Sequence, residues 1–319
     1  MSAPASVRNR HPADLRTWAL KPKIQKRLVI FLFAVIPISL LITFTYVPFF
    51  KMVQFSFYNM SYTKTRGFVG FKNYVDIFAK PEYFRSLYLS FYYMAGAVVQ
   101  LALALLLATV LSFGVKGANI FKGVLFFPYL INGIAIGFIF KFFFTRGYVL
   151  DSVLTALGIP LESLPYWLRD QRINNISLVF TSVWKYTGQN MVLFIGAIMS
   201  IDATLYEAAT IDGANKWHQF RYVILPGIRS VLLLNLILSI TGSLSAFEPP
   251  YVIMGGGANG TATYFIKMHE TAHTLHKVGM ASAMAVFLML IIIIVTVVQK
   301  LSFKYAFRKY ELDASGSMM

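Results

Sequence analysis

Long apolar stretches alternate with shorter polar segments along most of this chain. Each apolar stretch has at least the length, about twenty residues, that an α-helix needs to cross a bilayer. The pattern predicts six spans, at about 28–50, 87–113, 120–144, 176–201, 231–254 and 279–301. We therefore expect an all-α membrane protein with a transmembrane domain at 28–304, a tail at 1–27 before it and a tail at 305–319 after it.

Prolines interrupt three of these spans. Proline lacks a backbone donor, so within a membrane it is tolerated where protein or a water-filled cavity satisfies the freed groups. Pro37 and Pro48 in the first span favour kinks that serve packing. Pro128 in the third span and the Pro249-Pro250 pair in the fifth have polar neighbours, which favours a cavity beside them.

The polar segment between the fourth and fifth spans has the features of two short helices. Thr204 and Glu207 have the spacing of a capping box, which predicts that Thr204 caps the first helix. The Asp212-Gly213 pair predicts a turn after that helix, because glycine tolerates the positive φ that ends a helix.

The second short helix is expected at 214–222, with an apolar stripe of Trp217, Phe220 and Val223. Pro226 is expected to end it before the fifth span begins. Two such helices suit a groove on a partner protein, but they also suit a surface loop lying on lipid headgroups. The residues by themselves leave both alternatives open.

Composition supports the membrane interpretation. With 57% hydrophobic and only 13% charged residues, a soluble globular protein is excluded. The chain has no cysteine, which excludes a disulfide framework and thiolate–metal sites. The net charge of +16 is better explained by membrane topology than by nucleic-acid binding.

Both predicted tails are rich in lysine and arginine, which favours the cytoplasmic side of the membrane. An even number of spans returns the chain to the side on which it started, so both termini are expected in the cytoplasm. The first span has too long an apolar run for a cleavable signal, and no small-residue cleavage site follows it. We expect it to remain as a helix.

The polar segment also carries a family pattern. Glu207-Ala208-Ala209, then Gly213 and, after nine intervening residues, Val223-Ile224-Leu225-Pro226 resemble the signature of permease subunits of binding-protein-dependent ABC importers. Phe247 with 251–257, and 279–284, resemble the carbohydrate branch, and Pro128-Tyr129 with 138–141 resembles the larger maltose-permease subunit. The resemblance covers nearly the whole chain and implies the type I permease fold, in a bacterial plasma (inner) membrane.

The resemblance implies an assembly in which a short helix of each permease docks into a cleft on a cytoplasmic ATPase. The expected partners are two ATPase subunits, a second permease subunit that is a distinct homologue, and an extracytoplasmic substrate-binding protein. The chain has no Gly-x4-Gly-Lys-Ser/Thr loop, so ATP and Mg are expected on the partner ATPases, and this subunit is expected to hold no cofactor and to be no enzyme. The residues implied in coupling are Glu207, Ala208, Ala209, Asp212, Gly213, Trp217, Phe220, Leu225 and Pro226.

The same resemblance marks sugar-facing positions on three spans. Aromatic faces suit sugar rings, and hydroxyl and amide groups suit sugar hydroxyls. On the fifth span the alignment can slip by one residue. The candidate positions are Tyr129, Gly133, Ser182, Trp184, Lys185, Tyr186, Gln189, Ser239, Ser243 and Ser245.

Lys185 is the unusual member of this set. An ammonium group inside a span costs roughly 3 kcal/mol, so it normally faces a cavity or an opposite charge. One alternative is a structural pair, for example with Glu248, or snorkelling toward the outer surface; the other is recognition of an anionic substrate. The expected cargo is an oligosaccharide, with a uronate-containing one as the finer hypothesis and a glycerol-phosphate, polyol or other polar solute as the alternative.

Two further motifs suggest other chemistry. The glycine-rich stretch 255–260 is better explained as an outer loop near the binding protein than as a phosphate cradle, because no strand precedes it. His269-Glu270-x-x-His273 has the spacing of a zinc-binding helix, which makes a membrane metalloprotease the competing hypothesis. Its third ligand would have to be His276 or a distant carboxylate, so no metal site is expected.

Overall fold

The computed structural model describes residues 22–62 and 64–316 of the chain. Residues 1–21 of the predicted first tail and 317–319 of the predicted last tail lie outside the described residues. The chain divides into two compact units, which meet between Gln54 and Phe55.

The first unit is helical throughout its described part. It consists of α1 (Pro22–Leu41), a π-helical turn η1 (Ile42–Tyr46) and α2 (Val47–Phe55). Residues Lys26–Phe55 have a mean hydropathy of 2.7 and are long enough to cross a membrane. The helix continues past both Pro37 and Pro48; the π turn immediately before Pro48 gives its ring more room than an α turn would.

The second unit starts with a small antiparallel hairpin, β1 (Tyr58–Met60) and β2 (Thr65–Phe68), followed by α3 (Lys72–Ala79). The hairpin packs on the start of α15 (Val278–Gly316). A Cβ on Gly279 would lie 1.9 Å from the carbonyl oxygen of Tyr58, so only glycine permits this contact. In the described residues these two short strands are the sole departure from the predicted all-α fold.

The remaining long helices of this unit are α4 (Pro81–Ser112), α8 (Asn174–Met199), α12 (Arg229–Leu244) and α15. Among the described residues, four helical segments are long and apolar enough to span a membrane, and six if two bent helix pairs are each counted as one span. The six predicted spans correspond to these six. The last helix continues beyond the predicted end of its span, through most of the predicted tail.

The third predicted span is not one helix, which corrects the expectation for 120–144. It is built from α5 (Ala118–Leu130) and α6 (Gly133–Phe144), which meet at an angle of 99°. Pro128 lies in the last turn of α5, and the side chain of Asn132 caps α6 by accepting a hydrogen bond from the backbone N–H of Ile134 at 2.8 Å. Local residues therefore account for the break, since a proline lies where α5 ends and an asparagine caps the start of α6.

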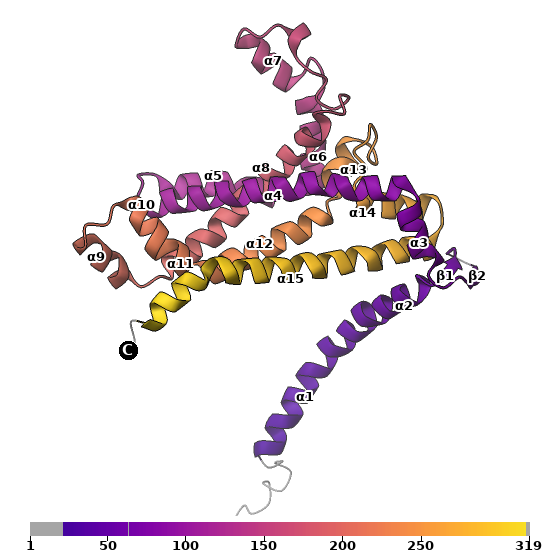
Figure 1. The fold of residues 1–319 in the computed structure, drawn as a ribbon, viewed down its shortest axis with the longest axis horizontal. Helices are drawn as coiled ribbons and strands as arrows, with labels where there is room; N and C mark the ends of the chain where they lie inside the picture. Colours follow the sequence, from indigo (N-terminus) through magenta and orange to yellow (C-terminus); the bar gives the residue numbers. More distant parts are fainter. Residues whose placement is uncertain (1–21, 63, 317–319) are drawn as a thin grey trace, which may run out of the picture. The chain divides into compact units, whose positions relative to one another are not determined.

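Short elements complete the second unit (Figure 1). The α6–α8 connection holds α7 (Val149–Ala156) and a 3₁₀ turn η2 (Leu161–Ser163). It is fastened by Asp151, 1% exposed, whose carboxylate accepts from Gly147 N and Trp167 Nε1 at 2.7 Å each and pairs with Arg146. The others are α9 (Ala203–Ile211), α10 (Lys216–Gln219), η3 (Phe220–Ile224), α11 (Leu225–Gly227), α13 (Glu248–Ile253), α14 (Tyr264–His269) and η4 (Glu270–Thr274).

The core of the second unit is the contact of α4 with α8, flanked by α5 and α12. Gly188 of α8 lies directly against the backbone of α5: a Cβ there would be 1.8 Å from the carbonyl oxygen of Leu125. Small residues at helix contacts allow such close approach within membranes. This packing holds α8 in place, and α8 carries half of the predicted substrate-binding residues.

Candidate functional site

The helix that carries Glu207 is capped by a different residue from the one predicted. The carboxylate of Asp202 accepts hydrogen bonds from the backbone N–H and the hydroxyl of Thr204, each at 2.9 Å. These bonds favour the charged form and lower the pKa of Asp202 below its usual value. Thr204 is thus inside α9, and the predicted capping box is wrong because the aspartate two residues earlier is the better acceptor.

Gly213 ends α9 as predicted. Its φ is +76°, and its N–H donates to the carbonyl of Thr210 while the N–H of Ala214 donates to the carbonyl of Ala209. This pair of bonds is a Schellman motif, in which glycine occupies the left-handed position. The motif fixes the direction in which the chain leaves α9.

The second short helix differs from the prediction at both ends. It begins at Lys216, with Asn215 as its cap, and does not end at Tyr222. A π-helical turn and α11 carry the helix through Pro226 to Gly227, because the wider turn accommodates a residue that lacks a backbone donor. The predicted stripe is also divided: Trp217 is exposed, while Phe220 packs against the core.

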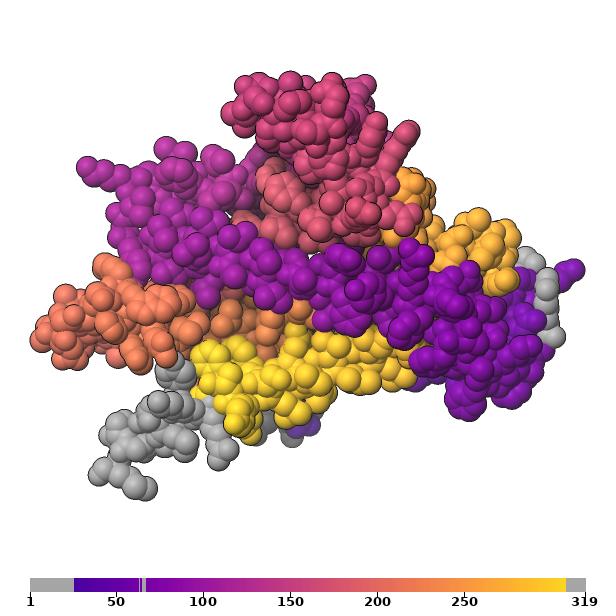
Figure 2. All heavy atoms as spheres, turned by 45° about the horizontal axis from the view of Figure 1, so that its top comes forward, coloured from indigo at the N-terminus to yellow at the C-terminus, as the bar shows by residue number. Residues whose placement is uncertain are grey.

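Residues of α9 and α10 project together at one end of the second unit (Figures 1 and 2). Leu205, Ile211 and Trp217 are exposed there, Ile211 to 86%, and Glu207 is exposed as well. A compact apolar surface with a carboxylate is suited to a groove on another protein. Of the residues implied in coupling, Ala208, Asp212 and Gly213 share this exposure, and Ala209, Phe220, Leu225 and Pro226 are half-buried.

A cavity of about 530 Å³ lies between α4, α6, α8, α12 and the start of α13. This volume is in the range of roughly 300–1,000 Å³ that is typical of small-molecule sites. Nine of the candidate residues named above line it: Gly133 at the start of α6, Ser182, Lys185, Tyr186, Gln189, Ser239, Ser243, Ser245 and Glu248.

Two sequence candidates lie outside the cavity lining. Trp184 is exposed, and its ring packs edge-on against Phe140, with the centroids 5.1 Å apart. Tyr129 is also exposed, and its ring centroid is 6.1 Å from that of Tyr186. Tyr129 therefore borders a lining residue, and neither side chain contributes to the cavity wall.

The cavity also has a wall that the sequence did not predict. Tyr93, Gly96, Ala97 and Gln100 of α4 line it, as do two asparagines, Asn190 of α8 and Asn235 of α12. The four residues of α4 have the spacing i, i+3, i+4, i+7, which places them on one face of the helix. Small and polar residues with this spacing in an otherwise apolar span are the sequence signal for this wall.

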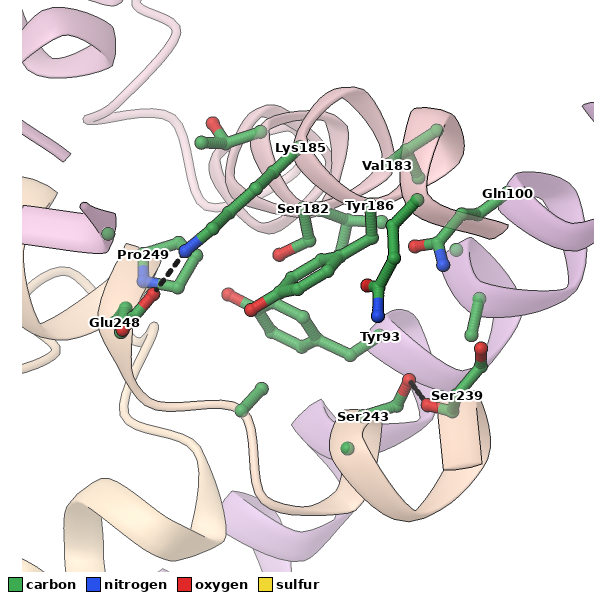
Figure 3. Close-up of a pocket in the computed structure, with 18 of the residues that line it drawn as sticks. Tyr93, Gln100, Ser182, Val183, Lys185, Tyr186, Ser239, Ser243, Glu248 and Pro249 are labelled. Atoms are coloured by element: carbon green, nitrogen blue, oxygen red, sulfur yellow. Dashed lines mark hydrogen bonds and ion pairs between the residues drawn. The ribbon is translucent and has the colours of Figure 1, made fainter. Parts of the chain in front are cut away.

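Lys185 and Glu248 form an ion pair at one side of the cavity, with Nζ and Oε2 2.9 Å apart (Figure 3). The Lys185 side chain is 11% exposed and that of Glu248 is 47% exposed. The ammonium group also lies 5.2 Å from the centroid of the Tyr186 ring. Of the two alternatives for Lys185, pairing with Glu248 is the arrangement present here, and the two charges cancel.

Gly133 makes room for this ion pair. A Cβ at position 133 would lie 1.8 Å from Oε2 of Glu248. The carboxylate therefore sits at the first residue of α6, where the partial positive charge of a helix N-terminus favours an anion. The carboxylate thus has two favourable partners, the Lys185 ammonium and the start of α6.

The two remaining motifs have structural partners. Glu270 pairs with Lys267 at 3.0 Å, and His273 is hydrogen-bonded to the hydroxyl of Tyr62. The rings of His269 and His273 are 4.5 Å apart, yet no group of three metal-ligating side chains is found within the described ranges. In the glycine-rich loop, Gly255, Gly256, Gly257 and Gly260 all have positive φ, as a succession of tight turns requires.

Comparison with known proteins gives one family. The profile described as "Binding-protein-dependent transport system inner membrane component" matches residues 100–304. The probable ABC transporter permease protein YurN of Bacillus subtilis is 30% identical over 88% of this chain and 97% of its own length. The multiple sugar-binding transport system permease protein MsmF of Streptococcus mutans is 30% identical (86% and 94%), and the osmoprotective compounds uptake permease protein GgtC of Synechocystis is 32% identical (81% and 92%).

Solved structures show the same fold. A chain of a bacterial ABC transporter involved in the import of the acidic polysaccharide alginate superposes with a TM-score of 0.78 at 18% identity, covering 89% of this chain and 97% of that chain. A chain of the alginate transporter in complex with its alginate pentasaccharide-bound periplasmic protein superposes with a TM-score of 0.76 at 19% identity, covering 90% and 96%.

Proposed function

Because this chain belongs to the family of binding-protein-dependent transport system inner membrane components, we propose that its polar cavity is the passage for an oligosaccharide. The chain is a permease subunit of an ABC importer of the carbohydrate class, and not an enzyme. The observation that carries the proposal is the lining of the cavity, where hydroxyl, phenol and amide groups from α4, α8 and α12 surround about 530 Å³. Such groups match the alternating donors and acceptors of a sugar.

The assembly that we propose follows from the exposed surface of α9 and α10. Glu207 and the apolar side chains around it would enter a cleft on a cytoplasmic ATPase, and ATP and Mg would be bound by two such ATPases. Closure of the ATPases would move α9 as a rigid body and rock the spans between inward- and outward-facing states. A distinct second permease would complete the pathway, an outer binding protein would deliver the cargo, and both termini would be cytoplasmic.

The experiment that tests the function uses proteoliposomes containing the permease pair and its ATPases, with the binding protein outside. A panel of maltotriose, raffinose, xylotriose, a trigalacturonate and glycerol is supplied, and uptake is measured per ATP hydrolysed. Uptake of a saccharide supports the proposal. Uptake of glycerol alone would favour the polyol alternative.

The finer proposal, an acidic oligosaccharide, rests on the unequal burial of the ion pair. The Lys185 side chain is mostly buried whereas that of Glu248 is about half exposed, so a substrate carboxylate could replace Glu248 as the partner of the ammonium group. Charge-assisted hydrogen bonds of this kind contribute about 1.5–3 kcal/mol. A glycerol-phosphate or a sugar phosphate would use the same group in the same way.

Replacement of Lys185 by glutamine is expected to lower uptake of a trigalacturonate by about tenfold or more, because the charged partner of the carboxylate is lost. Uptake of maltotriose is expected to change much less. Both rates are measured at a saturating concentration of loaded binding protein, and Glu248→Gln is the matched control that removes the opposite charge. Equal losses for the two sugars in Lys185→Gln would show that Lys185 is structural.

A further inference from the structure

The wall that α4 contributes to the cavity carries no charge. Tyr93, Gly96, Ala97 and Gln100 lie on one face of this helix because they are three, four and seven residues apart, and all four line the cavity. Among the described residues that line the cavity, the charged ones are Lys185 and Glu248. Figure 3 shows that pair at one side of the cavity and Gln100, Ser239 and Ser243 at the other.

Packing explains the ring of Tyr93 in this wall but not its hydroxyl group. It is 3% exposed, and its ring packs in a buried cluster with Ile136 and Leu178. Its hydroxyl is buried and has no hydrogen-bond partner within the protein. Leaving a buried hydroxyl unpaired costs about 1–3 kcal/mol, and phenylalanine would fill the same space without that cost. Because Tyr93 also lines the cavity, a small movement of its ring would bring this unpaired hydroxyl to a group that enters there.

The opposite wall has the same uncharged character. Asn235, Ser239 and Ser243 of α12 line the cavity, and Ser243 donates its hydroxyl hydrogen to the carbonyl of Ser239 at 2.7 Å, which leaves the hydroxyl oxygen as an acceptor. A carboxylate or phosphate between these walls would be desolvated without a cation beside it. A sugar hydroxyl, in contrast, donates one hydrogen bond and accepts others.

We propose that Tyr93 and Gln100 form an uncharged subsite that binds the hydroxyl groups of a neutral sugar unit, separate from the Lys185–Glu248 pair. This inference rests on the proposed function and extends it, because it assigns a substrate-binding role to α4, from which no site residue was predicted. It also narrows the cargo: whether or not one end is acidic, at least one unit is an uncharged sugar.

The test is direct binding to the permease–ATPase complex in lipid nanodiscs, without the binding protein, so that the affinity of that protein does not mask the cavity. Radiolabelled maltotriose, raffinose and xylotriose are the probes, and equilibrium dialysis gives Kd. Tyr93→Phe removes one oxygen and keeps the ring, so we expect Kd to rise about two- to tenfold, the effect of one neutral hydrogen bond.

Ser90→Ala is the matched control. Ser90 lies one turn before Tyr93 on α4, is fully buried and also has an unpaired hydroxyl, but it does not line the cavity. Its replacement is expected to leave Kd unchanged. An unchanged Kd in Tyr93→Phe, or an equal rise in Ser90→Ala, would overturn the subsite. A wild-type complex that binds none of these sugars and transports no saccharide would instead contradict the proposed function, and the subsite with it.

Discussion

Replacing Gly213 by proline is expected to abolish ATP-driven uptake while leaving the permease in the membrane. Gly213 has a φ of +76°, which proline cannot adopt because its ring fixes φ near −65°. Proline also lacks the N–H that bonds to the carbonyl of Thr210. The Schellman motif would be lost, and with it the fixed direction of α9 relative to α10. Because the spans themselves are untouched, insertion should be preserved.

The measurement compares uptake and ATP hydrolysis of the reconstituted complex with the amount of permease extracted from membranes. Gly213→Asn is the control, because asparagine adopts positive φ more readily than other residues and keeps the backbone donor. No atom lies within 4 Å of a Cβ at this position, so the comparison isolates the backbone. We expect at least tenfold lower uptake for proline and near-normal uptake for asparagine. Normal transport by Gly213→Pro would show that α9 is not the coupling element.

Glu207→Lys reverses the exposed charge and is expected to weaken ATPase docking in the same assay.

Replacing Gly188 by alanine is expected to have the largest effect on folding. The added Cβ would lie 1.8 Å from the carbonyl oxygen of Leu125 and 2.9 Å from Cα of Phe126, and backbone atoms cannot turn aside as a side chain can. α5 and α8 would have to separate. Overpacking in a core typically costs about 1–3 kcal/mol, and more where backbone must move.

The expected result is a several-fold lower yield of monodisperse permease in detergent, with a lower midpoint of thermal unfolding. Gly196→Ala is the matched control on the same helix, because a Cβ there meets nothing within 4 Å. A Gly188→Ala protein with the yield and the unfolding midpoint of Gly196→Ala would mean that α5 and α8 are not in contact as described.

Local features of the sequence predicted the elements well, and distant contacts account for what they missed. Hydropathy placed the long helices, and Gly213 marked the end of α9. The bend after Pro128 was signalled by the proline, but its angle of 99° depends on where α5 and α6 pack against α8. The capping residue was misassigned because Asp202 and Thr204 are both good caps in isolation, and only the backbone path decides between them.

The same distinction applies to the cavity. The resemblance to the maltose permease marked the residues of α8 and α12. Lys185 also stands out as a charge within a span, so its pair with Glu248 could be named from the sequence as one of two alternatives. Tyr93 did not stand out, because α4 is rich in tyrosine and phenylalanine and only packing shows which rings are buried with a hydroxyl toward the cavity. Trp184 was marked by the same resemblance, yet the rotation of α8 keeps it out of the cavity lining.

The Lys185–Glu248 pair also has a consequence for biogenesis. The two residues are 63 positions apart, so α8 is synthesised well before its counter-charge leaves the ribosome. Until then the ammonium group carries its cost of roughly 3 kcal/mol inside the membrane without compensation. The helix with the lysine must therefore be held by the insertion machinery, or by earlier helices such as α4 and α5, until the one with the glutamate arrives. Because of this order of synthesis, the charge in the fourth span is neutralised only when the fifth span is inserted.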